Sequence, residues 1–184
     1  MAPRHHILAV VVENKPGVLA RVAGLFSRRG FNIFSLAVSP TDDARYSRMT
    51  VVVDVESAPL EQVTKQLDKL INVLEIVELA PEKAVERELM LATVGACEAG
   101  ERSEIGTLAS IFEARILDVS RGAMTLMAAG TPEKLDSLEA LLRPYQILAI
   151  QRTGRIALPR LELSATGATS TKEEVGSGPV LRMA

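Results

Sequence analysis

Two halves of the chain carry the same order of segments: strand, helix, strand, strand, helix, strand. This repeat constrains the fold more than any other feature, because one small unit used twice accounts for most of the chain. In the first half, the apolar β-branched run Ile7–Val12 indicates a buried strand. Apolar residues then recur at helical spacing from Val18 onward, and Gly30 ends the predicted helix. Three more strands are predicted at residues 31–40, 48–55 and 73–79.

Two segments of this first half carry more detailed expectations. In the strand at 31–40, strict alternation places Ile33, Ser35, Ala37 and Ser39 on one face and Asn32, Phe34, Leu36 and Val38 on the other. Ser57 and Pro59 are typical of a helix start. The helix that follows them should turn five apolar residues inward: Leu60, Val63, Leu67, Leu70 and Ile71.

The second half repeats the pattern after a boundary at residues 80–83. Strands are predicted at 86–94, 115–120, 124–129 and 147–152. Ser103 is a candidate N-cap for a helix that buries Ile105, Leu108, Ala109 and Phe112. The run Thr131-Pro132-Glu133 predicts the start of another helix.

These patterns together predict an α+β fold. We expect two tandem ferredoxin-like βαββαβ domains, one at residues 5–80 and one at residues 84–160. Residues 164–184 are small and polar and lack apolar periodicity, so they cannot bury enough surface to offset the entropy of ordering. We therefore expect a flexible, disordered C-terminal tail.

Composition excludes several classes of function. The net charge is -2, so no strong field would attract nucleic acid, and an aromatic content of 3% leaves few platforms for stacking bases. The apolar run near the N-terminus is far shorter than the roughly 20 residues that span a bilayer. The single cysteine, Cys97, cannot form an internal disulfide, which fits a reducing compartment. We expect no nucleic-acid partner, no membrane association and a cytoplasmic location.

A complete catalytic site is not found in the sequence. The only histidines, His5 and His6, are adjacent on an extended segment and point to opposite sides, which makes them poor joint ligands. The Asp42-Asp43 pair lacks a third metal ligand at a suitable spacing and is interpreted as a solvated turn. Glu86 and Glu88 are interpreted as solvent-exposed charges at a strand edge, and no glycine-rich phosphate loop occurs. No metal site and no catalytic residue is predicted.

The junction between the first predicted strand and helix, NKPGVL, has two interpretations. A helix start presents unsatisfied N–H groups and the positive end of the helix dipole. Gly17 has no Cβ, so a ligand can approach closely, and Asn14 offers both a hydrogen-bond donor and an acceptor. These groups suit an α-carboxylate and an α-amino group. The junction is also compatible with a capped helix and a tight turn that bind nothing.

A second amide lies at the start of the next predicted strand. Asn32 again offers a donor and an acceptor. If two protomers pack side by side, Asn32 of one protomer approaches the junction of the other. A small apolar ligand side chain would then rest on Val18, Leu19 and Ile33.

Several blocks of the sequence resemble one family. The blocks NKPGVLARVAGLFSRRGFNI, SPTDD, SRMT, LEQVTKQLDKLINV and VERELML are similar to the small regulatory subunit of acetohydroxyacid synthase, also called acetolactate synthase. The first half of that family is an ACT domain, a ligand-sensing βαββαβ module. The similarity covers residues 5–160 and is strongest at residues 7–90. The stretches ILDVS and RTGRIAL resemble the family's C-terminal, ACT-like domain more loosely.

The resemblance implies a chain without catalytic activity of its own. Such a chain activates a separate thiamine-diphosphate-dependent catalytic subunit and makes it sensitive to valine or a related branched-chain amino acid. The motif match implies that Asn14, Gly17 and the N–H groups of Val18 and Leu19 hold the effector carboxylate. Asn32 would come from the partner protomer of an ACT-domain homodimer. Thiamine diphosphate, magnesium and FAD would belong to the catalytic subunit, and no residue here is assigned to them.

One residue departs from the family pattern. The family usually has an acidic residue where this chain has Phe34. The ring could fill space that the effector needs and give a feedback-insensitive activator, or it could be a neutral substitution at the dimer contact. A further alternative is a free-standing ACT-type sensor that acts on a different protein. No helix-turn-helix or basic face indicates direct DNA binding.

Overall fold

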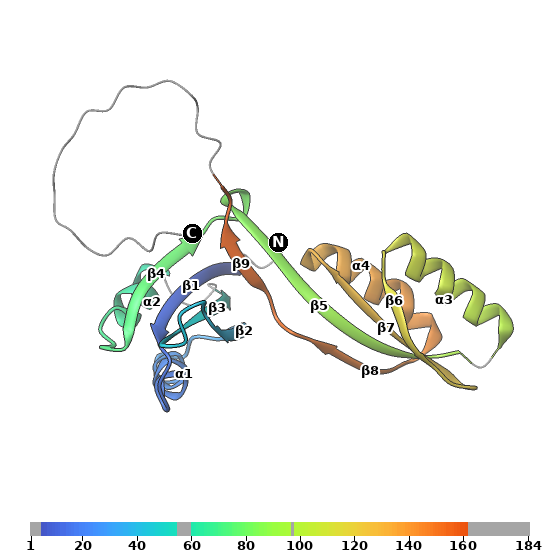
Figure 1. Cartoon of the computed structure of the whole chain (residues 1–184), viewed down its shortest axis with the longest axis horizontal. Coiled ribbons are helices and arrows are strands. Elements are labelled where there is room, and N and C mark those ends of the chain that lie inside the picture. The colour runs from blue at the N-terminus through green and yellow to red at the C-terminus, as the bar shows by residue number, and fades with distance from the viewer. Residues whose placement is uncertain (1–4, 55–59, 97, 162–184) are drawn as a thin grey trace, which may run out of the picture.

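Two βαββαβ units follow one another along the chain, as the repeat predicted (Figure 1). The computed structural model describes residues 5–54, 60–96 and 98–161. The predicted tail, Cys97, and the helix-start residues Ser57 and Pro59 lie outside this part of the chain.

The first unit is a four-stranded antiparallel sheet with two helices. Its elements are β1 (His5–Glu13), α1 (Val18–Arg28), β2 (Ile33–Pro40), β3 (Tyr46–Asp54), α2 (Leu60–Leu67) and β4 (Val73–Leu79). The strand order is β2-β3-β1-β4, so β2 and β4 form the edges. The helix α1 ends at Arg28 and is followed by Gly30, whose positive φ of 70° suits glycine, and the Phe31 N–H donates to the Phe26 carbonyl at 3.0 Å.

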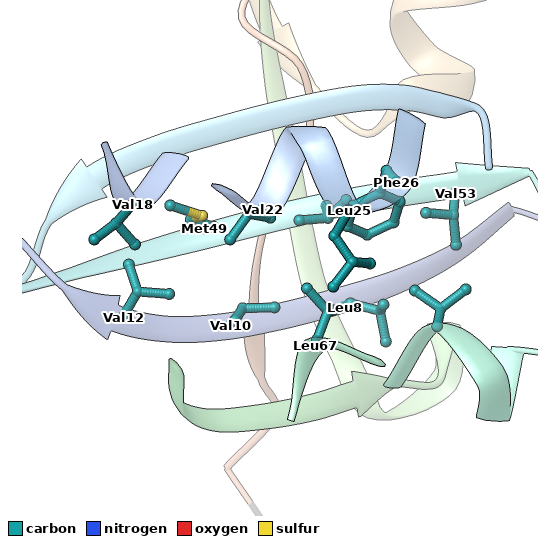
Figure 2. Close-up of a cluster of buried hydrophobic side chains, with 12 residues drawn as sticks. Leu8, Val10, Val12, Val18, Val22, Leu25, Phe26, Met49, Val53 and Leu67 are labelled. Carbon is teal, nitrogen blue, oxygen red and sulfur yellow. The ribbon is translucent and has the colours of Figure 1, made fainter. Parts of the chain in front are cut away.

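The core of this unit lies between the helices and one face of the sheet. Figure 2 shows side chains of α1 meeting those of β1 and β3, with Leu67 reaching in from α2. Alternate residues of β1 face this core because side chains alternate along a strand. The β1 members of the core are Leu8, Val10 and Val12.

The second unit has the same architecture. After the 3-10 turn η1 (Pro81–Lys83), its elements are β5 (Ala84–Gly95), α3 (Ala99–Ile111), β6 (Arg115–Val119), β7 (Ala123–Gly130), α4 (Pro132–Leu142), η2 (Arg143–Tyr145) and β8 (Ile147–Arg152). The strand order is β6-β7-β5-β8. As predicted, Thr131 caps α4, since its side chain accepts from the Lys134 N–H at 3.4 Å. The core between this sheet and its helices includes Met90, Ile105, Leu126, Leu135 and Leu138.

The sequence did not predict the last strand, β9 (Ile156–Pro159). This strand pairs antiparallel with residues 84–87 at the beginning of β5. The paired segments lie on the helix-free face of the first sheet, where Ala84 and Ala157 are buried among residues of the first unit. The first-unit members of this small cluster are Ile7, Ala9, Val52 and Leu79. The two units are therefore joined by a buried apolar contact as well as by the chain.

Two expectations about helices were wrong. The helix α3 begins at Ala99 rather than near Ser103. Its N-cap is Glu98, whose backbone N–H donates to the Glu101 carboxylate at 3.0 Å. Ile71 is 90% exposed because α2 ends at Leu67, before the helical stripe reaches it.

The alternation predicted along β2 holds from Ser35 onward and fails only at the beginning of the strand. Ile33 pairs with Val53 and packs against the core, whereas Ser35 pairs with Val52, whose side chain faces the opposite side of the sheet. Phe34 is the extra residue of a β-bulge between them. Because one residue is inserted, Ile33 and Ser35 point to opposite faces rather than to the same face.

Glu86 and Glu88 are not the solvated charges that were expected. The Glu88 side chain is 7% exposed, with Oε2 3.6 Å from Nη1 of Arg152, and Glu86 lies 3.7 Å from Arg155. The expectation failed because β8, β9 and the turn between them cover this edge of β5.

Candidate functional site

The helix α1 begins with an open N-terminus. Gly17 occupies the N-cap position with φ of 82°, a conformation that residues with a Cβ seldom adopt. No side chain caps the helix, and its first turn contains no acidic residue. A Cβ built on Gly17 would meet nothing within 4 Å, so the space beside the helix start is open. The N–H groups of the first turn are therefore accessible to an anion.

The first-turn N–H groups differ in what they already bind. The Val18 N–H donates to the Lys15 carbonyl at a long 3.3 Å, and the Arg21 N–H donates to the Gly17 carbonyl at 3.0 Å. The Leu19 N–H lies in the turn where a helix offers no internal acceptor. Leu19 is 44% exposed, so this position faces solvent. Leu19 thus presents the less committed of the two predicted donors.

Asn14 is fixed by the β2–β3 turn. Its backbone N–H donates to the Arg45 carbonyl at 2.7 Å, and its side-chain Nδ2 donates to the Ala44 carbonyl at 2.9 Å. In both bonds Asn14 is the donor, through its backbone N–H and through its side-chain Nδ2. No partner within the described residues engages Oδ1, which leaves an acceptor for an ammonium group.

The charged groups around the junction form pairs with one another. Glu13 accepts from Lys15 at 3.0 Å and from Asn72 at 2.5 Å, and Arg21 donates to the Asn72 Oδ1. The bonds from Lys15 and then Asn72 hold the pKa of Glu13 below its usual value. In the adjoining turn, the Asp43 carboxylate accepts three bonds from the Arg45 guanidinium and one from its backbone N–H, and the guanidinium contact is the first cause of its lowered pKa. Glu13 and Asp43, the carboxylates beside the helix start, are thus already paired with cationic side chains. This pairing lowers their repulsion of an anion that binds there.

The side chains predicted to contact an apolar ligand group have different environments. Val18 is 3% exposed and belongs to the core, as Figure 2 shows, so only its backbone faces the junction. Leu19 is exposed, Ile33 is half-buried against the core, and Asn32 is exposed.

Within one chain, the predicted site residues form two separate groups. Asn14 and Gly17 lie beyond the Glu13 end of β1, which pairs with Tyr46. Ile33 pairs with Val53, which pairs with His6 at the other end of β1. At about 3.4 Å per strand residue, the two groups are roughly 24 Å apart along the sheet. One protomer therefore does not bring Asn32 to the junction.

Three neighbours of the junction were missed by sequence reasoning. Arg21, Asn72 and Ala44 contact Glu13 or Asn14 directly or through one another. Arg21 lies off the apolar stripe of its helix, and that position alone gives no sign of a partner. The other two come from loops whose position depends on strand pairing, so no local pattern could have indicated them.

Other kinds of site find little support in the described ranges. There, no group of three or more His, Cys, Asp or Glu side chains could hold a metal ion. Asp43 of the predicted solvated turn accepts from Arg45. No helix in the described part of the chain is long and apolar enough to cross a membrane.

Comparisons with known proteins agree on one family. Residues 8–75 match the AHAS small subunit-like ACT domain, and residues 87–161 match a family described as the small subunit of acetolactate synthase. The acetolactate synthase small subunit of Mycolicibacterium smegmatis is 53% identical over 84% of this chain and 91% of its own length. This chain belongs to the acetolactate synthase small subunit family. The site residues 14–33 all lie within its ACT domain.

A second relative and a solved structure extend the similarity. The probable acetolactate synthase small subunit of Archaeoglobus fulgidus is 50% identical over 84% of this chain and 96% of its own length. The crystal structure of the acetolactate synthase small subunit from Thermotoga maritima has a TM-score of 0.79 and 36% identity, over 87% of this chain and 99% of that one. The small subunit family and its two-unit fold are thus shared along nearly the whole described chain.

Proposed function

We propose that this chain is the regulatory subunit of an acetolactate synthase. It activates a thiamine-diphosphate-dependent catalytic subunit in the cytoplasm and confers feedback inhibition by valine or a related branched-chain amino acid. The family supports the assignment to this enzyme. The observation that carries the sensing role is the uncapped start of α1, where Gly17 with φ of 82° leaves the approach to the helix N-terminus open. Thiamine diphosphate, magnesium and FAD belong to the catalytic subunit in this proposal.

The chemistry of the junction suits a zwitterion. The Leu19 N–H and the helix dipole attract the α-carboxylate, with the longer-bonded Val18 N–H beside them. The free Oδ1 of Asn14 accepts from the α-ammonium group. Leu19 of one protomer and the partner's Ile33 supply apolar surface for a small branched side chain.

A two-fold dimer through β2 explains the distance between the two groups of site residues. The strand β2 is an edge of its sheet, so its outer hydrogen-bonding groups are available to a second copy. An antiparallel pairing of two β2 strands places the beginning of one beside the end of the other. Pro40, at the end of β2, pairs with Ser47 near the Asn14 junction. Asn32 of the partner would therefore approach the junction, and the ligand would bind at the interface of two chains.

The environment of Phe34 supports an effector-competent protein over a feedback-insensitive activator. The ring stacks on His5 with a centroid separation of 4.1 Å, and the guanidinium of Arg155 lies 5.8 Å from its centroid. His5 lies on the same face of β1 as Ile7 and Ala9, so these contacts hold Phe34 toward the helix-free face of the sheet and the second unit.

Reconstitution tests the proposed function directly. The purified chain is mixed with its cognate catalytic subunit, and acetolactate formation is followed with and without L-valine. We expect a rise in turnover on mixing and a fall on adding valine. No rise in turnover would reject the regulatory-subunit role and favour a free-standing sensor with another partner.

Ligand analogues test the chemistry of the junction without the catalytic subunit. Calorimetry is carried out with L-valine, with isobutylamine, which lacks the carboxylate, and with 3-methylbutanoate, which lacks the ammonium group. We expect heat of binding for L-valine only, because each analogue loses one of the charged contacts. Equal binding of isobutylamine would remove the helix N-terminus from the site.

A further inference from the structure

A turn of the second unit contacts β2 next to the proposed effector residues. Residues 153–155 join β8 to β9, and Gly154 adopts a φ of 80°. The Arg155 N–H donates to the Ser35 Oγ at 3.1 Å. A Cβ on Gly154 would lie 3.0 Å from the same oxygen, so the two backbones approach closely here. We call Phe34, Ser35, Gly154 and Arg155 the β2–turn contact.

Aromatic and charged interactions strengthen this contact. The Phe34 ring stacks on His5, whose ring centroid is 4.1 Å away, and its centroid lies 5.8 Å from the Arg155 guanidinium. Arg155 Nη1 also lies 3.7 Å from Glu86 Oε2, and the two side chains are only 15% and 18% exposed. Arg155 therefore connects β2 of the first unit to β5 of the second.

One residue of the β2–turn contact, Phe34, lies on a β-bulge. Phe34 is the inserted residue between Ile33 and Ser35, so it has no paired residue in the β2–β3 ladder. A shift at the beginning of β2 can therefore move the bulge without disrupting the pairs that begin at Ser35. Asn32 and Ile33, the proposed effector residues, directly precede the bulge.

On the other side, the turn is fixed to its own unit. The Thr153 N–H donates to the Leu89 carbonyl at 3.0 Å, and the Leu89 N–H donates back to the Thr153 Oγ1 at 3.1 Å. The Arg160 N–H donates to the Lys83 carbonyl at 2.8 Å, at the far end of β9. A displacement of the turn is thus passed to β9 and the beginning of β5 together.

We propose that the β2–turn contact couples effector binding in the ACT domain to the position of the C-terminal unit. Ser35 and Phe34 are positioning residues for regulation, and neither touches the effector. An effector that contacts Asn32 fixes the position of the beginning of β2, and the bulge at Phe34 shifts with it. The bonded turn at residues 153–155 then shifts β9 and the beginning of β5. This inference rests on the proposed function, because it specifies how that same site regulates.

The coupling has a defined physical requirement. An effector changes the equilibrium between two arrangements only if it binds them with different affinity. Typical coupling changes an affinity or activity by roughly 5- to 150-fold, and removal of the connecting contact removes that factor. Effector binding itself should survive, since the binding groups stay in place.

The test compares Ser35→Ala and Phe34→Leu with a matched control, Ser39→Ala. Ser39 lies four residues along the same strand on the same face as Ser35 and is exposed. Each full-length variant is examined for L-valine binding by calorimetry, for valine inhibition with the cognate catalytic subunit, and for amide hydrogen exchange at residues 84–87 and 153–159.

In the wild type and in Ser39→Ala, we expect valine to inhibit and to change exchange at those residues. In Ser35→Ala and Phe34→Leu, the valine Kd should stay within about three-fold, while inhibition weakens by about five-fold or more. The Arg155 amide should exchange faster in Ser35→Ala even without valine, because its acceptor is gone. Undiminished inhibition together with an unchanged valine-induced exchange pattern in both variants would overturn the inference alone. A wild type that binds no valine would overturn the proposed function, and the inference with it.

Discussion

Charge at the N-cap of α1 should control effector affinity. Two variants, Gly17→Asn and Gly17→Asp, have side chains of nearly equal shape and differ in one negative charge. Both place a Cβ at φ of 82°, where Asn and Asp are the best tolerated of the other residues. Neither Cβ meets an obstruction, because no other heavy atom lies within 4 Å of the position it would take.

The expected magnitudes follow from this geometry. The positive φ should cost each variant about 1 kcal/mol, which lowers Tm by about 2–4 °C in a chain of this size. An Asp carboxylate at about 4 Å from the effector carboxylate repels it by about 1 kcal/mol in water and about 4 kcal/mol at an effective dielectric constant of about 20. Gly17→Asp should therefore bind L-valine more weakly than Gly17→Asn by at least about five-fold.

The assay is calorimetry of L-valine with both variants, accompanied by thermal unfolding of each. An Asp at a helix N-terminus interacts favourably with the dipole, so Gly17→Asp should be no less stable than Gly17→Asn. Weaker binding by the Asp variant would then reflect charge rather than loss of fold. Equal Kd values for the two variants would refute the placement of the effector carboxylate at this helix start.

Three further changes test the packing and the charged contacts. Leu138→Ala should lower the free energy of unfolding by about 2–5 kcal/mol, because it leaves a cavity at a fully buried position. The control Leu141→Ala, at a 48% exposed position on the same helix, should change the free energy of unfolding by less than about 1 kcal/mol. Denaturant titrations measure both. Arg152→Met should cost about 1–3 kcal/mol, since it leaves the 7% exposed Glu88 without its cation; an unchanged denaturation midpoint would refute this. Glu13 has a lowered pKa in the folded protein, so its contribution to stability is present above its ordinary value of 4.5 and is lost as the pH falls through the lower folded value. Glu13→Gln should therefore be less stable than the wild type at pH 7, with the difference disappearing in strongly acidic titrations, and a difference that grows on acidification would contradict the assignment.

Local patterns predicted most of the fold. The alternation of apolar residues in β1 and the helical stripe of α1 come from single faces that must be buried, so they are visible in the sequence. Thr131 and Gly30 carry cap signals that need no tertiary information. Elements of this kind were found at nearly their observed bounds.

The missed features depend on contacts between distant parts of the chain. The strand β9 is only four residues long, and its pairing with residues 84–87 depends on the open face of another unit. Glu88 is buried because Arg152 reaches it from a strand more than sixty positions later. The bulge at Phe34 inserts a residue without any glycine or proline to mark it. The periodicity of apolar residues along the chain contains no information about contacts between distant segments.

The candidate site was predictable in part for the same reason. The junction at Asn14 and Gly17 is local, and the sequence indicated both residues. In the proposed function Asn32 reaches the junction only from a second protomer, because one chain holds the two groups roughly 24 Å apart along the sheet.

Complementation between two defective protomers tests the central claim, that the effector binds where two chains meet. Gly17→Asp damages the junction, and Asn32→Ala removes the amide supplied by the partner. Each variant alone should bind L-valine more weakly than the wild type. A mixed dimer, isolated with two different affinity tags, contains one site that has both intact parts. The account predicts one valine per mixed dimer at the wild-type affinity, and a mixed dimer that binds no valine would contradict it.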